Sequence, residues 1–215
     1  MDIVLWLDDH LLVVNKPAGL PTLVDGYHPN APYLLGILQE EYDPLWVVHR
    51  LDRETSGVIV FARTAEAHRA LNVQFEGRQT EKTYHALVAG TPDWAEKDVR
   101  LPLRPDGDRR HRTVIDPLRG KPSVSELRVL ERYPDLTLIE AVPRTGRSHQ
   151  IRAHLAALGY PIAGDRLYGG KAVAGLRRMG LHACSLKLVH PLSGEEMTFH
   201  APYPEDLERA IERLR

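Results

Sequence analysis

A short charged motif followed at once by an apolar strand constrains this chain more than any other feature. The segment VHRLDRETSG, residues 48–57, places Asp52 between Arg50 and Arg53, and residues 58–61 read VIVF. A run without polar alternation is typical of a strand buried on both faces. Nearby guanidinium groups favour the ionised form of a carboxyl group. We therefore expect an ionised Asp52 at the mouth of a buried strand, acting as a nucleophile, a base or a structural ion-pair partner.

The rest of the chain reads as runs of strands with helices between some of them. Strands are predicted at 3–7, 10–15, 57–63, 81–88, 124–133, 136–142, 181–189 and 195–200. Helices are predicted at 32–41, 65–75, 148–158 and 204–214, with Thr64 capping the second and Ser148 capping the third. This order predicts an α+β fold with a mixed, mostly antiparallel sheet and flanking helices.

Composition narrows the class of protein. The 215 residues, 43% of them hydrophobic, fit a globular protein with one domain over residues 1–215. The chain has no run of the roughly 18 apolar residues that a membrane helix needs, and its start is unlike a signal peptide. Cys184 is the only cysteine, which excludes an internal disulfide and a thiolate metal cage. We expect a cytoplasmic protein that neither associates with a membrane nor holds a metal ion.

Charge is distributed unevenly along the chain, although the net charge is only −1. Residues 1–99 hold 8 Lys/Arg against 15 Asp/Glu, a net of −7, and residues 100–152 hold 12 against 7, a net of +5. Residues 153–215 hold 8 against 7, a net of +1. A basic middle indicates a local anionic partner, or simply a solvated face with surplus arginine.

Residues 101–121, LPLRPDGDRRHRTVIDPLRGK, differ from the rest of the pattern. Two prolines precede Asp106-Gly107, the basic cluster Arg109, Arg110 and Arg112 follows, and a short apolar stretch comes next. Long loops inside compact domains are usually functional or disordered. The apolar stretch favours an ordered arm or hairpin that carries its charge at the tip.

A second constellation is PRTGRSHQIRAH, residues 143–154. A turn and a helix start here can bring Arg147 and Arg152 towards one place, which suits recognition of phosphate or carboxylate by planar guanidiniums. His149 and His154 are five residues apart, a poor match to a zinc helix. Tyr84, in EKTY at 81–84, is either a core residue or a ring that stacks on a nucleobase and exchanges a proton.

These motifs together resemble the RluA-type pseudouridine synthases in order and spacing. The resemblance runs from about residue 13 to residue 202 and includes NKPAG at 15–19, HRLDRETSG at 49–57 and AGDRLYGG at 163–170. It implies the pseudouridine synthase fold with a catalytic cleft, and a uridine in a stem-loop of rRNA (23S) or tRNA, or both, as substrate. We expect a minimal catalytic domain without the S4-like RNA-binding domain of many relatives.

The resemblance also implies roles for individual residues. Asp52 would be the catalytic aspartate, attacking the sugar or deprotonating it, and Arg152 would pair with it. Tyr84 would stack on the target base and help to remove the C5 proton. Arg50 would enter the RNA helix where the target nucleotide leaves. The reaction implied needs no cofactor and no metal.

The remaining residues receive binding or structural roles. The arm at 101–121 would grip backbone phosphates through Arg109, Arg110 and Arg112. Arg147 and His149 are assigned to RNA binding, whereas His49 and residues 55–57 are interpreted as shaping the turn and residues 16–19 as structural.

Two other classes of protein stay open at this point. One is a non-enzymatic RNA-binding or ribosome-assembly factor on the same fold, and the other is a different carboxylate enzyme such as a glycosidase or N-glycosylase. Glycosidases normally use two carboxylates, and Glu54 is the near neighbour of Asp52 in sequence. A monomer without an obligate protein partner is the default expectation.

Overall fold

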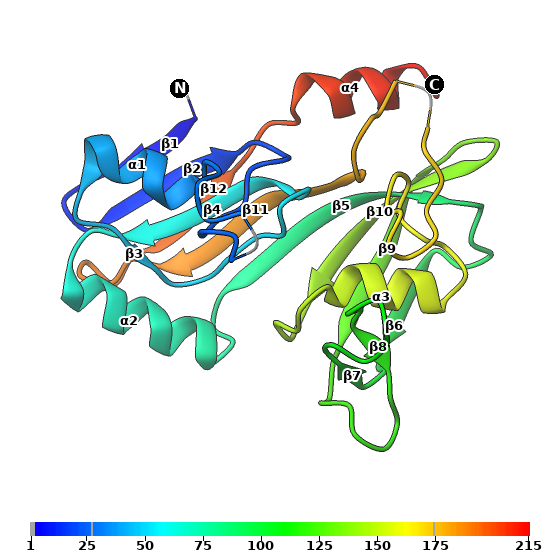
Figure 1. Ribbon diagram of the computed structural model, residues 1–215, viewed down its shortest axis with the longest axis horizontal. Coiled ribbons are helices and arrows are strands. Elements are labelled where there is room, and N and C mark those ends of the chain that lie inside the picture. Colours follow the sequence, from blue (N-terminus) through cyan, green and yellow to red (C-terminus); the bar gives the residue numbers. More distant parts are fainter. Residues whose placement is uncertain (1–2, 27, 174) are drawn as a thin grey trace. The chain divides into compact units, whose positions relative to one another are not determined.

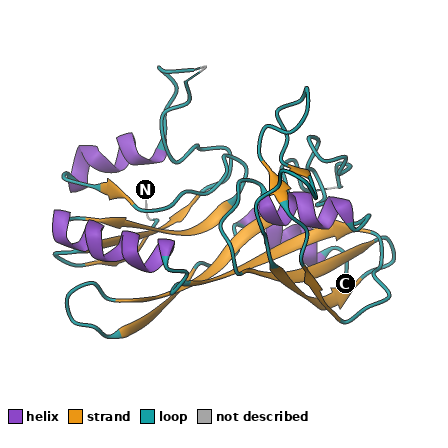
Figure 2. Ribbon diagram, turned by 90° about the horizontal axis from the view of Figure 1, so that it is seen from below, coloured by secondary structure: helices purple, strands orange, loops and turns teal. Residues whose placement is uncertain are grey.

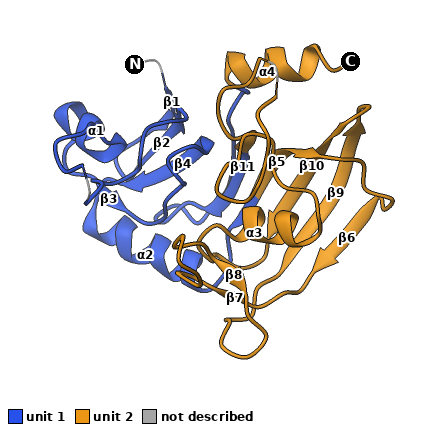
Figure 3. Ribbon diagram, turned by 45° about the vertical axis from the view of Figure 1, so that its right-hand side comes forward, with its two compact units in different colours: residues 1–82, 183–203 blue, residues 83–182, 204–215 orange. Residues whose placement is uncertain are grey.

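The computed structural model describes residues 3–26, 28–173 and 175–215, and the chain divides into two compact units (Figures 1 and 3). Unit 1 comprises residues 1–82 and 183–203, and unit 2 comprises residues 83–182 and 204–215. Each unit is thus assembled from segments that are distant in sequence. That residues 1–215 act as one catalytic domain stays a prediction.

Unit 1 is built on a layer of strands with two helices. Its strands run in the order β1-β2-β4-β11, with β3 paired to β4 and β12 paired to β11. Their bounds are Val4–Leu7 for β1, Leu11–Lys16 for β2, Trp46–Val47 for β3, Ser56–Ala62 for β4, Leu181–Val189 for β11 and Glu196–His200 for β12. The helices are α1, Leu34–Tyr42, and α2, Ala65–Glu76, and α2 packs against β3 and β4 (Figure 2).

Strand β4 is the centre of this unit. All seven of its residues are buried, as the apolar run predicts, and β2 pairs with it antiparallel with Leu12 opposite Phe61. Each fully buried Val, Ile or Phe side chain contributes roughly 1.5–3 kcal/mol by leaving water. A strand held in this way is a rigid support for the loop that enters it.

The strands of unit 2 run in the order β5-β10-β9-β6. The bounds are Glu81–Ala89 for β5, Glu96–Val99 for β6, Ser125–Arg132 for β9 and Leu136–Pro143 for β10, with helices α3, Gln150–Ala157, and α4, Glu205–Glu212. Helix α3 contacts β9 and β10, and its Ile151 and Leu155 enter a hydrophobic cluster with strand residues such as Val88 and Ile139. Two short strands, β7 at Leu103–Arg104 and β8 at Val114–Ile115, pair antiparallel.

The helix starts test the predicted caps. Thr64 caps α2 as predicted, since its Oγ1 accepts a hydrogen bond of 3.1 Å from the Ala67 N–H. The prediction that Ser148 caps α3 is wrong. The N-cap is His149 in a left-handed conformation, because Gln150 turns back and its Oε1 accepts from the Arg147 N–H at 3.1 Å and the Thr145 hydroxyl at 2.6 Å.

The fold class is confirmed: the chain has an α+β fold with a mixed, mostly antiparallel sheet and flanking helices. Within the part of the chain that is described, no helix combines the length and apolar character needed to span a membrane.

Candidate active site

The loop that carries Asp52, residues 48–55, lies between β3 and β4 and is called the Asp52 loop below. A buried lysine ties it to the preceding segment. Lys16 has 0% exposed surface, and its Nζ donates to the carbonyl oxygens of Pro17 at 2.9 Å, Leu20 at 2.7 Å and Arg53 at 3.1 Å. A buried ammonium group is tolerated only where its donors are satisfied. These bonds give Lys16 a structural role, in agreement with the interpretation of residues 16–19.

Further hydrogen bonds hold both sides of Asp52. Thr22 Oγ1 donates to the Leu51 carbonyl at 3.0 Å and accepts from the Leu51 N–H at 3.2 Å. The Arg53 guanidinium donates to the Gly19 carbonyl at 3.0 Å, so at least part of its hydrogen bonding is directed away from the carboxylate. The half-buried Asp52 closes a turn by accepting at its carbonyl from the Thr55 N–H at 3.1 Å. The backbone on both sides of Asp52 is therefore fixed.

His49 fastens the same loop to β4 and α2. Its Nε2 accepts from the Val60 N–H of β4 at 3.1 Å, and its ring stacks on Phe75 of α2 with centroids 4.5 Å apart. Burial of the imidazole, with a smaller contribution from the charge of Lys82, lowers the pKa of His49 to about 3. His49 is thus a neutral structural acceptor at neutral pH.

Gly57 is required where the loop becomes β4. Its φ is +119°, and a Cβ built there would lie 2.2 Å from the Ala183 carbonyl oxygen of β11. Only glycine tolerates both the conformation and the close approach. This turn explains the buried Thr55 and Ser56, and it agrees with the structural role predicted for residues 55–57. Arg50, by contrast, is exposed.

In unit 2, Tyr84 lies on β5 opposite Ala141 of β10. It is half-buried and packs against the hydrophobic cluster beneath α3. This placement serves a core role and leaves part of the side chain accessible. A catalytic role for Tyr84 stays a prediction.

Arg152 projects from α3 into a bidentate ion pair that the sequence reasoning missed. Its Nε and Nη2 donate to Asp165 Oδ2 and Oδ1 at 2.7 and 2.9 Å. The Asp165 side chain is 1% exposed and that of Arg152 is 11% exposed. Such a planar pair fixes the guanidinium in position and orientation. Asp52 belongs to unit 1, and its predicted pairing with Arg152 stays a prediction.

The other predicted residues around α3 have separate partners. Arg147 donates from Nε and Nη2 to the Pro122 carbonyl, both at 3.3 Å, rather than sharing Asp165 with Arg152. His149 has φ +51° and places its Nδ1 3.2 Å from the Tyr168 hydroxyl. Among the residues that the structure describes, no group of three His, Cys, Asp or Glu side chains is placed to hold a metal ion.

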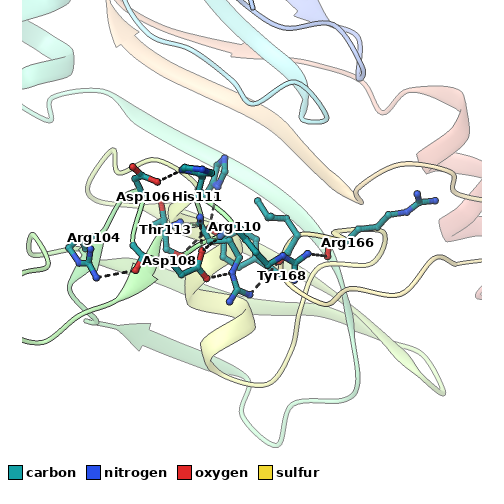
Figure 4. Close-up of polar contacts among 12 residues, drawn as sticks. Arg104, Asp106, Asp108, Arg110, His111, Thr113, Arg166 and Tyr168 are labelled. Carbon is teal, nitrogen blue, oxygen red and sulfur yellow. Dashed lines mark hydrogen bonds and ion pairs between the residues drawn. The ribbon is translucent and has the colours of Figure 1, made fainter. Parts of the chain in front are cut away.

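The arm at residues 101–121 is an ordered hairpin formed by β7 and β8. Arg109 and Arg110 are exposed near its tip (Figure 4 labels Arg110). Arg112 is partly neutralised, because its Nε donates to Asp108 Oδ2 at 2.6 Å. The pKa of Asp108 is lowered, chiefly by the hydrogen bond from the Arg112 backbone N–H. The Arg112 guanidinium and the Arg110 N–H lower it further. The three arginines are thus not equivalent.

Comparison with known proteins places these residues in a family. The family model described as RNA pseudouridylate synthase matches residues 10–157. The dual-specificity RNA pseudouridine synthase RluA of Escherichia coli K12 is 43% identical over 202 residues, covering 93% of this chain and 92% of its own. The ribosomal large subunit pseudouridine synthase C of Vibrio cholerae is 39% identical over 221 residues, covering 99% and 69%.

A solved structure agrees with the sequence relatives. Human RNA pseudouridylate synthase domain containing 4 superposes with a TM-score of 0.78 and 27% sequence identity, over 98% of this chain and 92% of that chain. The matched region contains the Asp52 loop, Tyr84 and Arg152. The chain belongs to the RluA-type RNA pseudouridine synthases, the isomerases that convert uridine to pseudouridine in RNA.

Proposed function

We propose that this enzyme isomerises a specific uridine in a stem-loop of 23S rRNA or tRNA, or both, with Asp52 as the catalytic carboxylate. The names of the relatives favour these RNAs: one is a dual-specificity RNA enzyme and another a large-subunit ribosomal enzyme. We further propose that it acts in the cytoplasm as a monomer without an obligate protein partner.

The observation that carries the proposal is the support given to Asp52. Lys16 and Thr22 hydrogen-bond to the backbone on either side of Asp52, and His49 fastens the same loop to β4. A rigid loop is what a nucleophile or base requires, since small displacements of a reacting group are costly.

The proposed reaction breaks the C1′–N1 bond, turns the base and joins C1′ to C5. C5 loses a proton and N1 gains one, so the mass of the RNA is unchanged. Asp52 attacks the sugar or removes a proton from it, and Arg152 holds the carboxylate ionised and aimed. Tyr84 stacks on the base and assists removal of the C5 proton. Arg50 occupies the space that the flipped nucleotide leaves.

The first test is pseudouridine mapping of total rRNA and tRNA, by carbodiimide labelling and reverse transcription, in cells with and without the gene. Loss of one or a few sites is expected, with restoration by the wild-type gene and not by Asp52→Asn. Restoration by the variant would remove Asp52 from the catalytic role.

Purified protein and transcribed RNA complete the test. Asp52→Asn should lower turnover by roughly 10³-fold or more, as loss of a nucleophile typically does, while RNA binding stays close to wild type. An N-glycosylase would leave an abasic site instead of an isomer of equal mass. Binding without either product would identify an RNA-binding protein and contradict the proposal.

A further inference from the structure

Tyr168 joins the arm to the segment that holds Arg152. Its hydroxyl accepts from the Thr113 N–H at 3.0 Å and donates to the Thr113 carbonyl at 3.0 Å. Thr113 is buried and lies in the arm just before β8. The same hydroxyl lies 3.2 Å from His149 Nδ1 at the start of α3. One oxygen thus connects Thr113 of the arm (Figure 4) with the start of the helix.

The ring of Tyr168 makes a different contact. The Cζ atom of Arg152 lies 5.0 Å from the ring centroid, and that of Arg112 lies 5.9 Å from it. Both distances are within the range of cation–π attraction. The Asp165 carboxylate binds the edge of the Arg152 guanidinium, and the Tyr168 ring packs against the same guanidinium. The guanidinium is therefore held by two residues from one short loop.

The same short loop, residues 165–168, also receives the arm through its backbone. Arg110 Nη2 donates to the Arg166 carbonyl and Arg112 Nη1 donates to the Leu167 carbonyl, each at 3.4 Å. Both bonds are long, and that of Arg110 is also exposed, so contacts with phosphate can replace them. The bonds of Thr113 to the Tyr168 hydroxyl are shorter and half-buried, so they are the durable part of the attachment.

We propose that Tyr168 is a positioning residue that couples the RNA-gripping arm to Arg152, with its hydroxyl holding the arm and its ring holding the guanidinium. The inference rests on the proposed roles of the arm and of Arg152. Burial raises the pKa of Tyr168, so the hydroxyl keeps its proton and its donor function at neutral pH. RNA bound by the arm then stabilises the same loop that orients Arg152.

The two functions of Tyr168 can be separated by substitution. Tyr168→Phe keeps the ring beneath Arg152 and removes both bonds to Thr113. Tyr168→Leu removes the ring as well. Tyr160→Phe is the matched control, because its ring packs against Trp94 and the hydrophobic cluster instead. Thermal unfolding of each variant measures any general loss of stability.

Activity is measured as tritium release from transcribed 23S rRNA and tRNA that carry 5-tritiated uridine. For Tyr168→Phe we expect KM to rise by about tenfold, the scale of two lost hydrogen bonds, with kcat within about twofold of wild type. For Tyr168→Leu we expect kcat to fall by at least about tenfold in addition. Tyr160→Phe should match wild type in both constants.

Limited trypsin cleavage after Arg109 and Arg110 gives a readout that does not depend on activity. We expect Tyr168→Phe to be cleaved there several times faster than wild type and Tyr160→Phe. Equal cleavage rates, an unchanged KM for Tyr168→Phe, or losses that merely follow thermal stability would each overturn the coupling. Wild-type protein that releases no tritium from either RNA would instead overturn the proposed function, and the cleavage rates would still decide whether Tyr168 holds the arm.

Discussion

Lys16 and His49 illustrate how single residues prepare a site without taking part in its chemistry. Both are ionisable side chains that fix the Asp52 loop, Lys16 by donating to the Arg53 carbonyl and His49 by accepting from the Val60 N–H of β4. The uncharged form of His49 is the one that can accept from the Val60 N–H. The integrity of the Asp52 loop is therefore tied to the protonation of a histidine.

This gives a prediction for the dependence of stability on pH. An unfolded histidine has a pKa of about 6.5, whereas the pKa of His49 in the fold is about 3. The unfolded chain thus binds the extra proton first. The stability contributed by neutral His49 is fully present above about pH 6.5 and is lost as the pH falls towards 3.

The test compares wild type with His49→Gln, which retains an acceptor but does not titrate. Urea unfolding should show the variant to be less stable at pH 7.5, with the difference in the free energy of unfolding narrowing at pH 4.5. His85 and His154, whose pKa values burial also lowers, affect both proteins alike and cancel in the difference. A difference that does not change with pH would contradict the assignment.

Residues differ in how well their structural roles can be predicted from the sequence. The turn around Asp52 and the structural role of His49 could be predicted because they belong to one contiguous motif, whereas Thr22, 29 residues before Leu51, could not. Asp165 and Tyr168 could not, because their partners Arg152 and Thr113 are 13 and 55 residues away in sequence. The motif AGDRLYGG at 163–170 supports the family resemblance, but it does not by itself predict the contacts of Asp165 and Tyr168. An aspartate beside glycines was the available signal.

Helices and strands also differ in how well the sequence predicts them. Long apolar strands such as β4 and β10 and the capped helix α2 were predicted within a few residues. Strand β6 was missed because its sequence, EKDV, is mostly charged and exposed, and pairing with β9 overrides its weak preference. Strands β7 and β8 have two residues each, too few to show a period. Their hairpin is predicted instead from its prolines, its glycine, its basic tip and the short apolar stretch that follows.

The arm allows a prediction at this scale. Arg109→Gln with Arg110→Gln should weaken RNA binding and reduce the slope of log affinity against log salt by up to about two, since each phosphate contact contributes roughly 0.7–0.9. Arg112→Gln should change the slope less, because Asp108 already neutralises that charge. The double substitution of Arg209 on α4 and of Arg213, the C-cap of that helix, to glutamine is the control. If the arm double variant keeps the wild-type slope, the arm does not contact phosphate.

The charge of the whole molecule sets how broadly it binds RNA. Residues 1–99 carry a net of −7 and residues 100–152 a net of +5. A chain with this distribution repels RNA from much of its length and attracts it in one segment. Long-range repulsion of this kind suppresses non-specific binding more than specific binding, in which short-range contacts dominate.

Neutralising exposed acidic residues should therefore strengthen non-specific RNA binding while leaving the rate of the reaction nearly unchanged. Glu40, Glu41 and Glu66 are exposed in unit 1, and changing all three to glutamine should raise affinity for poly(U) severalfold at about 0.1 M salt, where charges within about 10 Å still interact. The kcat on the mapped stem-loop should stay within about twofold of wild type, because none of the three braces the Asp52 loop. Filter binding and tritium release measure the two quantities. Unchanged affinity for poly(U) would mean that the acidic segment does not repel RNA, and specificity would then depend on contacts at the stem-loop alone.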